Sequence, residues 1–166
     1  TRSDDYLCNS LKKEGVSIYR GDLNNVYKRF LKFSNKLNDE DLIIRITGDN
    51  LLVDKYLINE MIQFYKINNY NYVSINRKKS KLPYGISVEL FNYRTLKKWK
   101  ASSTYEKEHV TPKITSNEKN QGYFIKKNST NFYKLKCSLD DIEDYFVVKT
   151  IFEKAKNIKL NYLKMF

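Results

Sequence analysis

Apolar residues follow two alternating patterns along the chain. Short runs rich in β-branched and aromatic residues predict strands at 16–19, 42–47, 72–75, 86–91, 122–127 and 132–139. Apolar residues at helical spacing predict a first helix ending at Gly15 and further helices at 23–37, 55–67, 94–100, 104–114 and 140–156. Asp54 is expected to cap the helix at 55–67.

Strand–helix alternation predicts an α/β fold with a mixed, mostly parallel sheet and helices on both faces. Segments near Gly85 and Gly122 have an antiparallel character, so a mixed edge is expected. Because no repeat or linker interrupts the pattern, the prediction is one domain over residues 1–166. The basic loop 77–85 follows a predicted strand, which is where such folds face their ligands.

Acidic residues follow two of the predicted strands. The run 43–47 ends in Gly48-Asp49, and the run 132–139 ends in Asp140-Asp141. Carboxylates at the carboxyl edge of a sheet can converge on one divalent cation, and a triphosphate is a common reason to hold one there. The alternative is that each Asp opens a turn and caps the following helix.

The amino-acid composition indicates which classes of protein the chain can belong to. The chain has 166 residues, 41% of them hydrophobic, which is enough for a globular core. No apolar run approaches the roughly 18 residues of a membrane helix, so no membrane partner is expected. Cys8 and Cys137 lack metal-ligand spacing and are expected to be buried, reduced thiols of a cytoplasmic protein.

The formal net charge of +12 raises the question of nucleic-acid binding. The lysines are scattered in ones and twos along the whole chain, however, and the alternation of basic and aromatic residues at 126–136 also fits a half-exposed strand. A solvated basic surface that attracts anionic substrates is the favoured interpretation, and nucleic acid is not expected to be the main partner.

Five collinear segments resemble one enzyme family. Residues 19–30 resemble its "FRG…DVL.RF" segment, 45–54 its "RITGDCPLID", 83–91 its "P.GLDVEVF", 105–112 its "YEREHVTP" and 135–144 its "LRLTVDTPED". The family is that of the spore-coat polysaccharide cytidylyltransferases, which are related to the CMP-sialic acid and CMP-Kdo synthetases. The resemblance covers nearly the whole chain.

The resemblance implies a Rossmann-like nucleotide-diphospho-sugar transferase fold and transfer of a cytidylyl group from CTP to an acidic sugar. It implies Mg²⁺ held by Asp49 and Asp140, which with His109, the one histidine of the chain, would be the catalytic residues. Homodimerisation is common among such enzymes and is a further expectation. The substrate-binding residues would be Arg20, Gly21, Arg45, Gly85, Glu89 and Glu106.

Several of these residues have structural alternatives. Arg45 could form an ion pair beneath the sheet, and Arg20-Gly21 could be a turn after a strand. Asp140 competes with a capping role, and Asp141 could exchange with it. Gly85, near a strand start, is expected to permit close approach of another backbone segment.

The chain also departs from the family pattern. Asn50-Leu51 replaces the usual Cys-Pro pair, and Ser87 replaces an Asp. The family's first strand and its Gly-Ser-Arg-rich loop with Lys, which cradles the triphosphate, have no counterpart from Thr1 onward, so a fragment or truncated member is expected. Two alternatives to an active enzyme follow: a catalytically incomplete relative that binds a sugar nucleotide or a protein, and a basic nucleic-acid-binding module.

Overall fold

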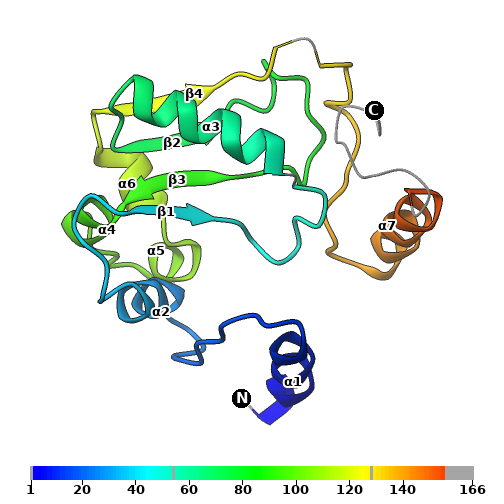
Figure 1. Cartoon of the computed structure of the whole chain (residues 1–166), viewed down its shortest axis with the longest axis horizontal. Helices are drawn as coiled ribbons and strands as arrows, with labels where there is room; N and C mark the ends of the chain where they lie inside the picture. Colours follow the sequence, from blue (N-terminus) through cyan, green and yellow to red (C-terminus); the bar gives the residue numbers. More distant parts are fainter. Residues whose placement is uncertain (1, 54, 128, 156–166) are drawn as a thin grey trace. The chain divides into compact units, whose positions relative to one another are not determined.

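The structure, a computed structural model, describes residues 2–53, 55–127 and 129–155. Its elements are shown in Figure 1. Within the described residues, two compact units can be distinguished: one contains residues 2–41 and 93–117, and the other contains the described residues of 42–92 and those from 118 onward. Asp54, expected to cap a helix, lies outside the described residues, as does the predicted helix end at 156.

The second unit contains a four-stranded sheet in the order β1-β3-β2-β4. Its strands are β1 (Leu42–Arg45), β2 (Tyr72–Ile75), β3 (Glu89–Asn92) and β4 (Gln121–Phe124). β3 is antiparallel to both β1 and β2, whereas β4 is parallel to β2. Three strands therefore run in one direction and one runs against them, which confirms a mixed α/β sheet. The antiparallel strand lies inside the sheet, not at the edge where it was expected.

Helix α3 (Lys55–Ile67) packs against β2, β3 and β4 and covers one face of this sheet (Figure 1). Side chains alternate between the two faces of a strand, so Val73 and Leu90 point toward α3. They form the core of the unit together with other buried residues from the helix, from β4 and from the loop before β3: Leu57, Met61, Leu82, Ile86, Val88 and Phe124. Met61 and Val73 are fully buried.

The first unit is helical. It contains the 3₁₀ turn η1 (Arg2–Asp4) and the helices α1 (Asp5–Lys13), α2 (Val26–Phe33), α4 (Tyr93–Lys98), α5 (Thr104–His109) and α6 (Pro112–Asn117). Helix α2 packs against α5, and the buried Tyr27 hydroxyl donates to the Leu96 carbonyl at 2.9 Å. Gly15 has φ = +74°, so it ends α1 in the left-handed conformation that its lack of a side chain favours, as predicted.

Two predicted strands are wrong. Residues 16–19 form no strand, and the Val16 amide bonds to the end of α1. Residues 132–139 contain a turn closed by the Leu135 amide on the Phe132 carbonyl, and only an isolated parallel bridge, Lys136 to Tyr84, follows it. Apolar alternation predicts a strand only where a neighbouring strand is available to form a ladder.

The predicted helix at 104–114 is divided into α5 and α6. Val110 has φ = +70°, and Pro112 opens α6. Proline lacks an amide hydrogen and disfavours helical geometry in the residue before it, so it begins a helix and does not continue one. The last described helix is α7 (Ile142–Ala155). Across the described ranges, no helix has the length and apolar character needed to cross a membrane.

Candidate active site

The structure places Asp49 and Asp140 on neighbouring segments. Asp49 lies in the turn that follows β1, where the Asn50 amide donates to the Thr47 carbonyl at 3.1 Å. The Leu139 amide donates to the Asp49 carbonyl at 3.0 Å. The residue directly before Asp140 is thus bonded to the backbone of Asp49, although the two aspartates are far apart in the sequence.

A glycine makes this arrangement possible. Gly85 is buried with φ = +90°, and a Cβ atom at this position would lie 2.3 Å from the Ser138 amide nitrogen and 2.5 Å from the Cys137 carbonyl carbon. The Tyr84 amide donates to the Leu135 carbonyl at 2.8 Å, and the Cys137 amide donates to the Tyr84 carbonyl at 2.7 Å. The expected close backbone approach at Gly85 is confirmed, and the approaching segment is the one that leads to Asp140.

Arg77, in the basic loop after β2, also holds this segment. Its guanidinium lies 4.0 Å from the centroid of the Tyr133 ring and donates to the Tyr133 carbonyl at 2.8 Å. It also donates to the Leu82 carbonyl at 3.4 Å. Arg77 therefore joins the chain before Gly85 to the chain before Asp140. Sequence reasoning missed this residue, since only the basic character of the loop pointed to it.

Helix α7 is capped by Asp141, not by Asp140. The Asp144 amide donates to Asp141 Oδ1 at 2.9 Å, and Asp144 Oδ2 accepts the amides of Asp140 at 2.9 Å and Asp141 at 3.2 Å. This reciprocal pattern is a capping box, here with Asp at the third helical position. The capping alternative for the acidic pair thus applies to Asp141, and the carboxylate of Asp140 is left for other contacts.

Those contacts are with a hydroxyl and an ammonium group. Asp140 Oδ2 accepts the Ser138 hydroxyl at 2.6 Å and lies 3.1 Å from Lys136 Nζ. The Ser138 hydrogen bond, followed by the Lys136 hydrogen bond, lowers the pKa of Asp140 below its usual value. Asp140 is therefore a carboxylate at neutral pH, the form that a hard cation requires.

The donor chemistry of Asp49 and Asp140 suits a magnesium ion held by few protein ligands. Within the described residues, no group of three or more His, Cys, Asp or Glu side chains is placed to hold a metal. Mg²⁺ in nucleotide sites usually takes one or two carboxylates and completes its shell with waters and phosphate oxygens. Asp49 and Asp140 on adjacent segments offer such a pair. Their role as metal ligands stays a prediction.

Arg45 and Glu89 bind each other across the sheet. They are register partners on β1 and β3, and their side chains, 15% and 13% exposed, form an ion pair. The Tyr72 hydroxyl donates to the second Glu89 oxygen at 2.6 Å, and burial, reinforced by Glu89, raises the pKa of Tyr72. The ion-pair alternative for Arg45 is thus what the structure shows. Substrate binding by these two residues stays a prediction.

Glu106 and His109 both lie on α5 but have different surroundings. Glu106 forms a capping box with Ser103, and it also accepts the Ser102 amide and hydroxyl, each at 2.7 Å. These hydrogen bonds, led by that from the Ser102 amide, lower the pKa of Glu106 to about 2. The exposed His109 ring lies 4.4 Å from the Tyr105 ring, centroid to centroid. Glu106 thus has a structural role, and His109 is accessible to a ligand.

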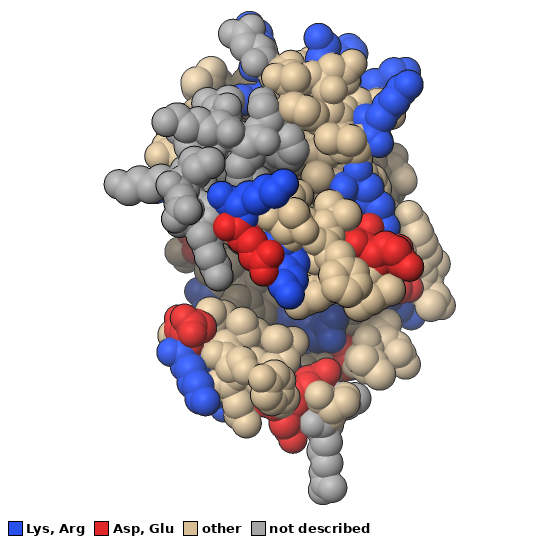
Figure 2. Space-filling view, turned by 90° about the vertical axis from the view of Figure 1, so that its right-hand side faces the viewer, with Lys and Arg blue, Asp and Glu red and all other residues tan. Residues whose placement is uncertain are grey.

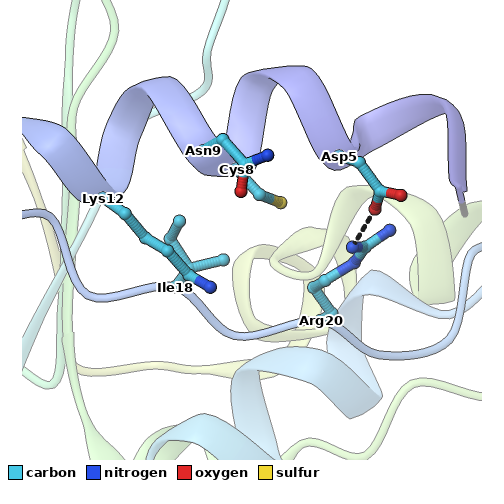
Figure 3. A pocket seen from close by; sticks show the side chains of 6 residues that line it. All are labelled: Asp5, Cys8, Asn9, Lys12, Ile18 and Arg20. Carbon is cyan, nitrogen blue, oxygen red and sulfur yellow. Dashed lines mark hydrogen bonds and ion pairs between the residues drawn. The ribbon is translucent and has the colours of Figure 1, made fainter.

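Arg20 lines a hollow beneath α1 (Figure 3). The hollow has a volume of about 490 Å³ and is lined by Asp5, Cys8, Asn9, Lys12, Ile18 and Arg20. Arg20 forms an ion pair with Asp5, whose hydrogen bond raises the pKa of the guanidinium. Gly21 is exposed, and a Cβ atom there would lie 2.9 Å from the Arg29 side chain.

The predicted site residues are divided between the two units. The sheet unit holds Arg45, Asp49, Gly85, Glu89 and Asp140, and the helical unit holds Arg20, Gly21, Glu106 and His109. The sheet unit therefore carries both predicted metal ligands.

Charges of both signs are mixed on one face of the molecule. Figure 2 shows one face, on which Lys and Arg side chains are interspersed with acidic and uncharged ones. Several basic residues pair with acids, among them Arg94 with Glu40 and Lys97 with Asp39. A protein that binds along a nucleic-acid backbone needs basic side chains gathered along one path.

Comparison with known proteins identifies the family. The sequence profile of the family described as "Cytidylyltransferase" matches residues 4–166. The chain belongs to the cytidylyltransferase family. The spore coat polysaccharide biosynthesis protein SpsF of Bacillus subtilis is 30% identical to this chain over 160 residues, and an uncharacterized protein of Methanocaldococcus jannaschii is 42% identical over 113 residues.

The alignment with SpsF covers 92% of this chain and 64% of SpsF. The alignment with the Methanocaldococcus jannaschii protein covers 67% of this chain and 43% of that protein. A cytidylyltransferase structure from Leptospira borgpetersenii serovar Hardjo-bovis matches with a TM-score of 0.85 at 25% identity. That match covers 98% of this chain and 69% of the other. The Rossmann-like fold expected from the sequence is confirmed.

Proposed function

We propose that the protein transfers a cytidylyl group from CTP to a hydroxyl group of an acidic sugar, forming a CMP-sugar for surface polysaccharide synthesis. Family membership supports a nucleotidyltransferase role. The observation that carries the proposal further is the hydrogen bond from the Leu139 amide to the Asp49 carbonyl, because it places the carboxylate-bearing residues 49 and 140 on adjacent segments.

In the proposed reaction, the sugar hydroxyl oxygen forms a bond to the α-phosphorus of CTP. The bond from that phosphorus to the bridging oxygen breaks, pyrophosphate leaves with the electron pair, and the hydroxyl proton is released. Mg²⁺, when bound, would neutralise charge developing on the phosphates. Asp49 and Asp140 would hold it. His109, exposed at the end of α5, is proposed to contact the acceptor sugar.

The test is pyrophosphate release by the purified chain from CTP, with Mg²⁺ and a panel of acidic sugars, compared with Asp49→Asn and Asp140→Asn. Both variants are expected to lose at least about 100-fold in rate while keeping the wild-type melting temperature. Glu143→Gln is the matched control, because it removes an exposed carboxylate from the first turn of α7, close to Asp140 in the sequence.

Wild-type rates in both variants would contradict the assignment of these aspartates. CTP binding without pyrophosphate release for any sugar would support the catalytically incomplete relative instead. We place the activity in the cytoplasm, where CTP is made, and homodimerisation stays a prediction.

A further inference from the structure

Lys136 occupies the centre of an acidic cluster beside the proposed metal ligands. Its Nζ atom lies 3.1 Å from Asp140 Oδ2 and 3.5 Å from Asp141 Oδ2, and it donates to Asp144 Oδ2 at 2.5 Å. Its side chain is 41% exposed. The proposed reaction has so far not used this residue.

We propose that Lys136 makes the pair Asp49 and Asp140 selective for one form of a divalent cation. The pair would bind the cation that is already bound to a nucleoside triphosphate in preference to the free cation. This inference rests on the proposed function, since it assumes that Asp49 and Asp140 bind the metal. Lys136 acts here as a specificity-determining residue, through its charge.

The first step of the argument is electrostatic. One oxygen of the Asp140 carboxylate, Oδ2, lies 3.1 Å from Lys136 Nζ. A free dication on that carboxylate would therefore lie a few ångströms from a positive charge and be repelled. A cation that carries a triphosphate brings several anionic oxygens, and these attract the same ammonium. The sign of the interaction with Lys136 thus depends on whether phosphate accompanies the metal.

The second step is that Lys136 would stay in position when Asp140 binds a metal ion. Asp144, its nearest contact, is itself fixed because it accepts two backbone amides in the cap of α7. Asp141 is fixed as the residue that caps the helix. The ammonium is therefore anchored to the helix cap by two carboxylates other than Asp140. Lysine side chains are charged at neutral pH, so the anchored group is a cation.

The third step concerns what remains without the lysine. Three carboxylates, those of Asp140, Asp141 and Asp144, would lose their shared cation, and the surroundings of Asp140 would become more negative. Such a cluster attracts any free divalent cation and repels a triphosphate. Removal of Lys136 is thus predicted to change the two affinities in opposite directions, a result that general damage to the fold would not produce.

The experiment measures Mn²⁺ binding to the whole chain by electron paramagnetic resonance, and Mn²⁺–CTP binding by titration calorimetry. For Lys136→Met, the affinity for free Mn²⁺ is expected to rise about tenfold, and that for Mn²⁺–CTP to fall by a similar factor, as is typical when one unit charge near a dication is removed at a solvent-exposed site. Both changes should shrink in high salt. Lys136→Arg, which keeps the charge, should restore both affinities.

Lys134→Met is the matched control, since Lys134 is an exposed lysine on the same segment. It should leave both affinities within twofold of wild type.

Asp49→Asn separates the inference from the proposed function. If Asp49→Asn abolishes Mn²⁺–CTP binding while Lys136→Met leaves both affinities unchanged or shifts them in the same direction, the inference is wrong and the metal site stands. If Asp49→Asn has no effect on Mn²⁺–CTP binding, both the inference about Lys136 and the proposed metal site are wrong.

Discussion

Replacing Gly85 by alanine tests whether the close backbone approach builds the site. The added Cβ atom would lie 2.3 Å from the Ser138 nitrogen, 2.5 Å from the Cys137 carbonyl carbon and 2.8 Å from the Ser138 Cα atom. All three are backbone atoms, so no side chain can rotate away to relieve the contact. The segment that leads to Asp140 would have to move.

The loss in free energy of unfolding caused by Gly85→Ala can be calculated from three contributions. The backbone has φ = +90° at Gly85, which costs an alanine about 1–3 kcal/mol. Movement of the 135–138 segment would weaken the Tyr84–Leu135 and Cys137–Tyr84 hydrogen bonds, each worth about 1 kcal/mol. The expected loss in free energy of unfolding is therefore about 3–5 kcal/mol, a large part of the roughly 5–15 kcal/mol of a typical domain.

The assay is urea unfolding of Gly85→Ala beside Gly48→Ala. Gly48 is the matched control, because a Cβ atom there meets nothing within 4 Å. Gly48→Ala should stay within about 0.5 kcal/mol of wild type. Any folded Gly85→Ala protein should also bind Mn²⁺–CTP more weakly, because Asp140 would be displaced from Asp49. If Gly85→Ala unfolds at the same urea concentration as Gly48→Ala, the close approach does not exist as described.

Two further predictions concern buried or hydrogen-bonded groups. The pKa of Glu106 is about 2 in the folded protein against an ordinary value of 4.5, so its carboxylate stabilises the fold above about pH 4.5 and this contribution is lost as the pH falls toward 2. Glu106→Gln should lower the melting temperature at pH 7, and the difference from wild type should vanish in melting curves near pH 2. Tyr72→Phe removes a donor to the partly buried Glu89 and should cost about 1–3 kcal/mol in urea unfolding, whereas replacing the exposed Tyr123 by Phe should cost less than about 0.5 kcal/mol.

Sequence patterns predicted the elements whose signals are local. The helix at 55–67 and the strand at 72–75 have the bounds that the structure shows, because a continuous apolar face and a short β-branched run are both visible within one segment. The failures are elements whose existence depends on distant partners. The run at 132–139 looks like a strand, but its neighbours are the loop residues around Tyr84, which form an isolated bridge and not a ladder.

In the candidate site, too, local features were predictable and features that depend on distant segments were not. The close approach at Gly85 was predictable because glycine is the residue that tolerates it, yet the approaching segment could not be named. The choice between Asp140 and Asp141 as helix cap also stayed open, since both precede the same helix. It is decided by Asp144, whose side chain reaches back to the two amides and whose amide bonds to Asp141.

The pairing of Arg45 with Glu89 depends on sheet register, which local patterns do not contain. β1 and β3 are antiparallel neighbours in the described sheet, and their register sets these two residues opposite each other, with Tyr72 of β2 bonding the same carboxylate. Leu90 points to the α3 core, so by strand alternation Glu89 points to the other face. The ion pair therefore joins β1 to β3 at the point where the chain leaves β1 for the turn that carries Asp49. Mutating either residue is therefore expected to shift that turn, so a loss of activity alone would not show that the residue touches the substrate.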